Sequence, residues 1–362
     1  MTGKYSGVYW KSLMNELNDF LSRFYTPQDY PALYAQLGKW QKSRPLDGIK
    51  ILDATPVFRN TMVKYSVLLA AGADITVSTG KDIPYDPEIL KILPRFGIRT
   101  ADDKIRRETF DVVADCAGRH RNVSSRFGYA ELTRSGLEYY RDCPQPVFSV
   151  DSGILKRFET TLGTGESFVR AMKHLGFYSF SGKKVLIFGG GKVGRGTAYY
   201  SALAGAKTLI VDKNTITPPA GVDFISTSES KRLSAELADA WCVVSATGLP
   251  GVLAEYVPAL LQNKPVIANM GVEDEFGETL PESAVLNNKR PLNFILEEPT
   301  WISYIDPSMA LSNAALLSLL QKNLVPGINL PPSAMEMQII DDIRNTGKMN
   351  NEIDLILKEF NL

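Results

Sequence analysis

Short apolar runs alternate along this chain with segments whose apolar positions recur at helical spacing. In the first half, the runs at 49–54, 74–77 and 110–115 are bounded by turn residues and predict buried strands. Residues 60–71, closed by Gly72, predict an amphipathic helix, and residues 1–44 are helical in pattern. Strands that alternate with helices are typical of a parallel sheet with helices on both faces.

The second half repeats this alternation. Apolar runs after Gly182 and at 208–211, 240–246 and 265–269 predict four more strands. Further helices are predicted at 312–321 and, as an amphipathic tail, at 350–362. Residues 149–165 show no clear periodicity, and we interpret them as the connection between two domains.

A glycine-rich turn follows the strand after Gly182. Gly189, Gly191 and Gly194 fit the pattern G-x-G-x-x-G, with Lys192 and Val193 inside the turn. Asp212 lies 21 residues after Gly191, at the end of the next apolar run. A strand, this turn, a helix, a second strand and a terminal acid form the dinucleotide-binding fingerprint, in which the helix N-terminus faces the pyrophosphate. An acid at position 212 favours NAD over NADP, although Lys213 beside it weakens that preference.

We therefore predict an α/β protein with two doubly wound parallel-sheet domains, the second a Rossmann NAD-binding domain. A chain of 362 residues is long for a single core. The expected boundaries are 1–155 with about 308–345 for a substrate or catalytic domain, 166–305 for the NAD-binding domain, and 346–362 for a C-terminal helix.

Composition narrows the classes of function. Lys+Arg and Asp+Glu both number 40, so no net charge favours nucleic acid or an anionic membrane. No apolar run approaches the length of a membrane span, and residues 1–20 lack the apolar core of a signal peptide. Three scattered cysteines are typical of reduced thiols in a cytoplasmic protein. With two histidines, a multi-histidine metal site is excluded, and we expect no metal.

The ends of the predicted strands offer site residues. Ligands of doubly wound sheets bind beyond the carboxyl ends of the strands. Asp53 and Asp115 end two such strands, so both are candidates. Asp115 either binds substrate or caps the turn that follows it.

In the order of its predicted strands, helices and motifs, the chain resembles the S-adenosylhomocysteine hydrolases, enzymes of two α/β domains with tightly held NAD. The resemblance covers roughly residues 45–340. It is carried by 189–196, Asp212, 246–248, 269–271, Asp151 and Ser152, Phe158 and Glu159, Gly163, Glu166 and Ser167, Pro307 and Ser308, Ser312 and Asn313, and 325–331.

The resemblance implies a reaction and a set of residues. That family uses NAD⁺ to oxidise a ribose 3′-hydroxyl, eliminates a thiol, adds water and reduces the ketone again, with acid and base groups beside the sugar. By this resemblance Asp115 and Glu159 keep catalytic carboxylates. The cofactor-binding residues it implies, beyond the glycine turn and Asp212, are Thr133, Ser135, Thr160, Thr247, Gly248, Asn269 and Gly271. Asn60 and Thr61 are the implied substrate contacts. Asp306, which precedes Pro307, either binds a substrate group or initiates a turn.

At other catalytic positions the chain departs from the family. Pro56, Val272 and Asp306 stand where the family has histidines, and Leu155 stands where it has a lysine, with Lys156 adjacent. Leu132 stands where it has a glutamate, with Glu131 adjacent. The family's C-terminal tail, which reaches the NAD of a neighbouring protomer, has no match. Proline and valine cannot transfer protons, so efficient hydrolysis of S-adenosylhomocysteine is not expected.

Three residues remain as candidates for proton transfer beside Asp115. Lys156 and Glu159 form a candidate pair for the substrate hydroxyl, or else an exposed hinge pair. His120 either replaces a lost base or belongs to a solvated basic loop.

We expect an NAD-dependent enzyme that oxidises a secondary hydroxyl of a nucleoside-like or other small substrate, as a dimer or tetramer. The alternatives are a non-catalytic NAD-binding regulator or scaffold, and a dehydrogenase of the 2-hydroxy acid type that exchanges NAD freely.

Overall fold

The structure is a computed structural model that describes residues 7–79, 83–101, 103–321, 324–345 and 348–358. The chain forms two compact units. The first comprises Met1–Lys156 and Ile305–Ile353, and the second comprises Arg157–Tyr304 and Asp354–Leu362. Within the described ranges, no helix is long and apolar enough to cross a membrane.

The first unit is built on a seven-stranded sheet in which every pair of neighbours is parallel, in the order β12-β6-β5-β4-β1-β2-β3. The strands are β1 (Lys50–Asp53), β2 (Asp74–Ser78), β3 (Arg99–Ala101), β4 (Thr109–Asp115), β5 (Ser124–Glu131), β6 (Pro146–Ser149) and β12 (Gly327–Asn329). The chain reverses its direction of travel across the sheet between β1 and β4. In doubly wound folds this switch point is where ligands bind.

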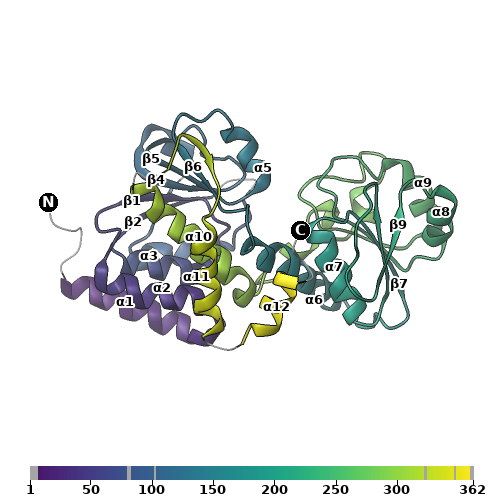
Figure 1. The fold of residues 1–362 in the computed structure, drawn as a ribbon, viewed down its shortest axis with the longest axis horizontal. Helices are drawn as coiled ribbons and strands as arrows, with labels where there is room; N and C mark the ends of the chain where they lie inside the picture. Colours follow the sequence, from purple (N-terminus) through teal and green to yellow (C-terminus); the bar gives the residue numbers. More distant parts are fainter. Residues whose placement is uncertain (1–6, 80–82, 102, 322–323, 346–347, 359–362) are drawn as a thin grey trace. The chain divides into compact units, whose positions relative to one another are not determined.

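Helices cover this sheet on both faces. They are α1 (Gly7–Ser22), α2 (Pro31–Ser43), α3 (Thr61–Ala70), α4 (Pro87–Ile92), α5 (Arg134–Leu137), α10 (Ile302–Leu320) and α11 (Ser333–Arg344). One more helix, α12 (Asn350–Lys358), is divided between the two units after Ile353. Figure 1 shows α1, α2 and α3 gathered on one side of the strands, where α3 packs against both α1 and α2. The expected tail helix ends at Lys358 in the structure, and its last four positions lie outside the described residues.

The prediction that residues 60–71 form an amphipathic helix is wrong in one respect. All ten residues of α3 are buried, including Lys64. The helix packs against β2 and is covered in turn by α1 and α2, so it has no solvent-facing stripe. Sequence periodicity cannot reveal a second layer of helices supplied by another segment.

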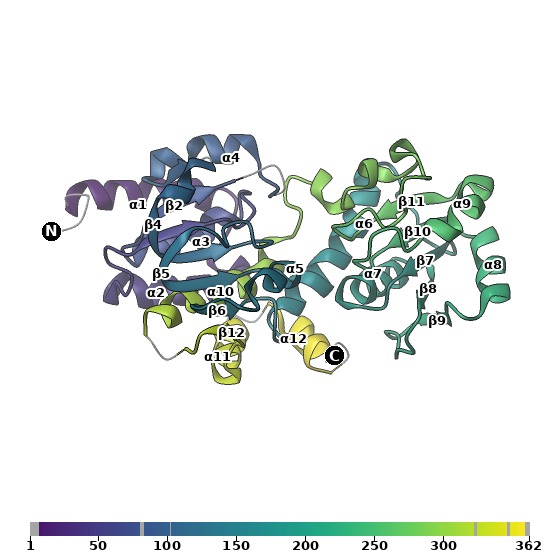
Figure 2. The ribbon, with the colours of Figure 1, turned by 90° about the horizontal axis from the view of Figure 1, so that it is seen from above.

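The second unit contains a five-stranded parallel sheet in the order β11-β10-β7-β8-β9, which Figure 2 shows from above. Its strands are β7 (Lys184–Phe188), β8 (Lys207–Asp212), β9 (Val222–Ser226), β10 (Cys242–Ser245) and β11 (Val266–Asn269). The covering helices are α6 (Thr164–His174), α7 (Lys192–Leu203), α8 (Ser230–Ala238) and α9 (Val257–Asn263). Here the switch point lies between β7 and β10.

Strand β7 shows why the parallel strands read as unbroken apolar runs. Val185 and Ile187 join one buried cluster, whereas Leu186 and Phe188 join another. Because successive side chains point to opposite faces, a strand buried on both faces must be apolar throughout. The fold class is therefore the predicted one, two doubly wound parallel-sheet units.

The segment 149–165, interpreted from its sequence as the connection between two domains, is helical over its second half, which its sequence periodicity did not indicate. The helical segment begins at Lys156, passes through a π-helical stretch at Phe158–Gly163 and continues as α6. This stretch lies close to α7, since a Cβ at Gly196 would lie 1.8 Å from the carbonyl oxygen of Thr161. π-Helical turns occur frequently at functional sites.

Candidate functional site

The glycine turn of the second unit sits at the switch point between β7 and β10. Gly189 has φ +106, which favours glycine. A Cβ at Gly194 would lie 1.8 Å from the carbonyl oxygen of Gly189, so helix and turn pack too closely for any side chain there. A Cβ at Gly191 would meet nothing within 4 Å. Gly191 is therefore not required by the protein's own packing, and it leaves open space at the N-terminus of α7, where the first N–H groups lack intrahelical partners.

Asp212 ties the end of β8 to this turn. Its carboxylate accepts hydrogen bonds from the backbone N–H of Gly190 (2.7 Å) and of Asn214 (2.8 Å). Each oxygen takes one of these bonds and retains acceptor capacity for the hydroxyls of a ribose. Lys213 and Asn214, which follow it, are exposed at the rim.

Arg195 is a buried residue of the site that sequence reasoning missed. Its Nε donates to the carbonyl of Gly190 (2.9 Å) and its Nη1 to the carbonyl of Thr217 (2.8 Å). Burial lowers the pKa of this guanidinium, and the nearby Asp212 carboxylate partly offsets that effect. The side chain fastens the glycine turn to the loop after β8. In the sequence, Arg195 could have been singled out only as a cationic residue directly after Gly194, the third glycine of the motif.

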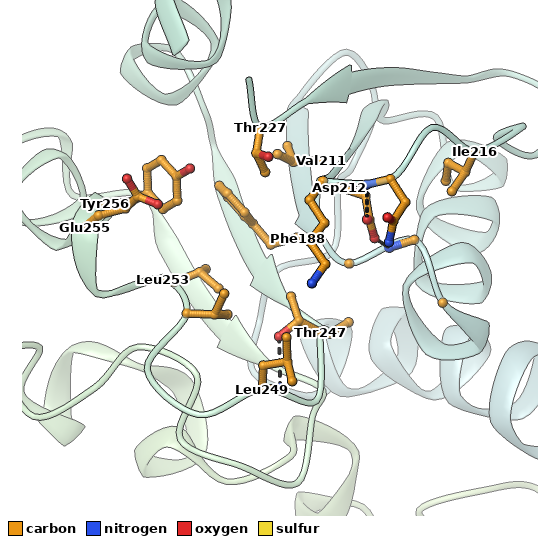
Figure 3. A pocket seen from close by; sticks show the side chains of 17 residues that line it. Phe188, Val211, Asp212, Ile216, Thr227, Thr247, Leu249, Leu253, Glu255 and Tyr256 are labelled. Atoms are coloured by element: carbon orange, nitrogen blue, oxygen red, sulfur yellow. Dashed lines mark hydrogen bonds between the residues drawn. The ribbon is translucent and has the colours of Figure 1, made fainter. Parts of the chain in front are cut away.

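Beside the turn lies a cavity of about 480 Å³ (Figure 3). Asp212 and Ile216 lie on one side of it, and Leu253 and Tyr256 on the other. Its lining residues are Phe188, the three consecutive glycines from Gly189, Val211 to Asn214, Ile216, Thr227, Ala246, Thr247, Leu249, Val252, Leu253, Glu255 and Tyr256. A mainly apolar cavity with convergent polar groups at a helix N-terminus fits a dinucleotide.

Two of the expected cofactor residues, Thr247 after β10 and Asn269 at the end of β11, differ in their surroundings. Thr247 lines the cavity. Asn269 is fully buried and its side chain is occupied internally: Oδ1 accepts from Ser245 and from the N–H of Gly271, and Nδ2 donates to the carbonyls of Glu273 and Lys289. Thus Asn269 holds the loop after β11 in place.

In the first unit, Asp115 is buried at the end of β4 and acts as a loop cap. Its carboxylate accepts from the backbone N–H of Cys116 (2.9 Å), from that of His120 (2.9 Å) and from the hydroxyl of Tyr140 (2.5 Å). Burial raises the pKa of Asp115 to about 6, against the lowering effect of these donors. Of the two roles that the sequence leaves open, turn capping is the one that the geometry displays, and the His120 ring is buried beside this loop.

Glu131 lies next to Asp115, since β5 pairs with β4 in that register. Its carboxylate accepts from the N–H groups of Ala117 and Gly118 and from the hydroxyl of Thr133 (2.6 Å). Thr133 also caps α5 through the N–H of Gly136, whereas Ser135 is exposed on that helix. Two buried carboxylates therefore organise the loop after β4.

Glu131 makes stability depend on pH. Burial, and then repulsion from Asp115, raise the pKa of Glu131 to about 7. A carboxyl whose pKa rises on folding stabilises the folded state most below its unfolded pKa, and that contribution is lost as pH rises through the folded value. We expect the free energy of unfolding to fall between pH 5 and about 7, and to fall less in Glu131→Gln. Urea denaturation at both pH values checks this; equal slopes for wild type and variant would contradict it.

Asp53, the other candidate at this edge, is part of a buried ion pair. Lys64 of α3 donates to its Oδ2 and also to the hydroxyl of Thr55 (2.7 Å), and both charged side chains are 0% exposed. Tyr65 donates to its other oxygen (3.3 Å). Asp53 is therefore a structural anchor at the switch point, and Lys64 was missed because the helix was expected to be amphipathic.

Two expected substrate contacts form hydrogen bonds within the first unit. The Thr61 hydroxyl is buried, donates to the carbonyl of Pro56 (2.7 Å) and accepts from the N–H of Phe58 (3.2 Å). Asp306 is fully buried and accepts from the N–H groups of Ala32 (2.8 Å) and Leu33 (2.9 Å), the first turn of α2. Burial raises its pKa to about 7. Both side chains complete local structure. Asn60, before α3, is buried as well.

The remaining candidates lie near the unit boundary. Lys156 is buried and ends the first segment of the first unit. Glu159 and Thr160 are half-buried in the π-helical stretch of the second unit. Val272, where the resemblance would place a histidine, is 84% exposed.

The second unit contains an NAD-binding domain. A family model described as "Putative NAD(P)-binding" matches residues 177–274. That stretch holds the glycine turn, Asp212 and the loop after β10, which agrees with the cavity described above.

Several curated proteins are similar to this chain over about half to seven tenths of its length. The adenosylhomocysteinase of Sulfolobus acidocaldarius is 26% identical over 269 residues, which are 67% of this chain and 64% of that protein. The adenosylhomocysteinase of Thermoplasma acidophilum is 23% identical over 71% of this chain and 70% of that protein. An S-inosyl-L-homocysteine hydrolase of Methanosarcina acetivorans is 24% identical over 49% of this chain and 51% of that protein. The chain thus spans just under two thirds of the Sulfolobus relative.

Among solved structures, a transhydrogenase from Sinorhizobium meliloti aligns with 74% of this chain and 95% of its own, with a TM-score of 0.44 and 12% identity.

Proposed function

We propose that this chain, a divergent relative of the adenosylhomocysteinases, is an NAD-dependent enzyme that oxidises a secondary hydroxyl of a nucleoside-like small molecule. The observation that carries the proposal is the NAD cradle at the switch point of the second sheet, where Gly191 leaves room for a pyrophosphate and Asp212 presents acceptors for a ribose. When bound there, NAD⁺ accepts a hydride from a carbinol carbon. We further propose a cytoplasmic homo-oligomer, either a dimer or a tetramer.

The hydroxyl proton needs an acceptor from the protein. We assign this role to Glu159, because the resemblance places a carboxylate there and the π-helical turn sets it apart from the regular helix. A positioned base of this kind contributes about 10²- to 10⁴-fold to a rate. Asp115 and Glu131 are buried and hold the loop after β4 through hydrogen bonds to its backbone N–H groups. We therefore do not assign either of them as the acceptor of the hydroxyl proton.

The reaction is expected to differ from hydrolysis of S-adenosylhomocysteine. Pro56 and Val272 cannot carry protons at the positions where the resemblance has histidines. Oxidation of the alcohol requires one base and the cofactor, so it is the step that these residues still support. The S-inosyl-L-homocysteine relative makes both adenine and hypoxanthine compounds reasonable substrates to test.

We expect purified protein with NAD to form NADH when mixed with a compound from a panel of adenosine, inosine and their homocysteine thioethers. Glu159→Gln should slow NADH formation by about 10²- to 10⁴-fold because the proton acceptor is lost. Glu282→Gln, an exposed glutamate of the same unit, is the matched control and should behave as wild type.

Other results would favour other functions. Retained NAD with no turnover on any compound, unchanged in Glu159→Gln, would favour a regulator or scaffold. NAD that is lost on dialysis, with turnover on 2-hydroxy acids, would favour an exchanging dehydrogenase.

A further inference from the structure

Glu275 is a buried carboxylate behind one wall of the NAD cavity. It follows β11 in the loop 270–276 and is 0% exposed. Its Oε2 accepts from the backbone N–H (2.9 Å) and the hydroxyl (2.7 Å) of Thr247, and its Oε1 accepts from the N–H of Gly248 (2.7 Å). All three donors belong to the loop that leaves β10.

The loop after β10 forms the cavity wall that faces the glycine turn. Leu249 and Val252 are apolar, more than a third exposed, and line the cavity. The far end of this loop is also attached to the Glu275 segment, because the N–H of Gly251 donates to the carbonyl of Asp274 (2.8 Å) and that of Leu253 to the carbonyl of Glu275 (2.8 Å). The near end is held by the Glu275 side chain.

The segment that carries Glu275 is itself rigidly supported. Asn269 donates to the carbonyl of Glu273, and Lys289 forms an ion pair with Asp274 (2.8 Å). A fixed support of this kind holds the wall in one geometry before the cofactor arrives. Preorganisation raises affinity because less conformational freedom is lost on binding.

Gly271 fits the same arrangement. A Cβ at Gly271 would lie 2.0 Å from Oε1 of Glu275, whereas its backbone has no left-handed φ that would demand glycine. The sequence resemblance associated Gly271 with the cofactor. The geometry gives another reason for the glycine: it admits the Glu275 carboxylate.

We infer that Glu275 is the positioning residue of the NAD site, and that Gly271 is a glycine in order to make room for it. Glu275 acts through Thr247 and Gly248 and does not touch the cofactor. Since Glu275 is enclosed, burial raises its pKa, and the Thr247 and Gly248 donors oppose that rise.

A double-mutant cycle on NAD affinity tests this inference. We expect Glu275→Ala and Gly271→Ala each to weaken NAD binding at least tenfold, the first by releasing the wall and the second by displacing the carboxylate. The double variant should bind no more weakly than Glu275→Ala alone, because the added methyl group then enters the space left by the glutamate. Glu273→Gln, on the exposed side of the same segment, should match wild type.

The outcomes separate the possible failures. Additive losses in the double variant would overturn the role given to Gly271, and wild-type affinity in Glu275→Ala would overturn the role of Glu275. If Glu275→Ala does not fold, Thr247→Val removes one donor while leaving the carboxylate, and the inference then requires weaker NAD binding without a lower melting temperature. Failure of the wild-type chain to bind NAD would instead remove the cofactor site on which this inference rests.

Discussion

Replacing Lys64 with methionine is expected to destabilise the first unit by about 3–5 kcal/mol, the usual cost of removing one partner from a buried ion pair. The substitution keeps the length of the side chain but leaves the Asp53 carboxylate enclosed and without its cation, while the Thr55 N–H and the Tyr65 hydroxyl still donate to it. Urea denaturation of the holoprotein measures the change.

Two comparisons make this result interpretable. Lys42→Met, on the exposed end of α2, should change the free energy of unfolding by less than about 0.5 kcal/mol. Asp53→Asn combined with Lys64→Met should recover part of the loss, since no unpaired charge then remains in the interior. A loss below about 1 kcal/mol in Lys64→Met would show that the pair is more hydrated than its complete burial indicates.

Alanine at two glycines of the turn should separate cofactor binding from folding. The methyl group of Gly191→Ala would meet no protein atom within 4 Å, so the melting temperature should stay unchanged. NAD affinity should fall at least tenfold, about 1.4 kcal/mol, because the methyl group occupies the space of the phosphates. Gly194→Ala should lower both, with NAD affinity reduced about 100-fold, because its Cβ would lie 1.8 Å from the Gly189 carbonyl oxygen.

Gly38→Ala is the control for the loss of glycine itself. Gly38 lies in α2 with nothing within 4 Å of its Cβ position, and alanine should leave NAD binding unchanged. Isothermal titration and thermal melting of the same preparations decide the matter. Wild-type NAD affinity in Gly191→Ala would mean that phosphates do not approach this backbone.

The glycine turn was predictable because its requirements are local. A positive φ at Gly189, a close helix contact at Gly194 and an acid after the next strand all follow from one βαβ unit. Three strands of the first sheet lacked a local apolar run that would predict them. Strands β3 and β12 are short, and β5 (Ser124–Glu131) contains several polar residues among its apolar ones.

The structural roles that the sequence did not predict depend on distant segments. Asp306 and the first turn of α2 are 274 positions apart, and no local pattern marks a carboxylate as the cap of such a helix. Glu275 lies 28 positions from Thr247, in a loop whose other acids are exposed. A buried acid among exposed acids cannot be recognised until the loop is folded.

We have proposed that the glycine turn of the second unit holds NAD. The decisive experiment is mass analysis of the nucleotide released when the purified protein is denatured. We expect NAD or NADH in close to stoichiometric amounts in the wild type and a large loss in Gly194→Ala. No released nucleotide, together with no binding of added NAD, would contradict it.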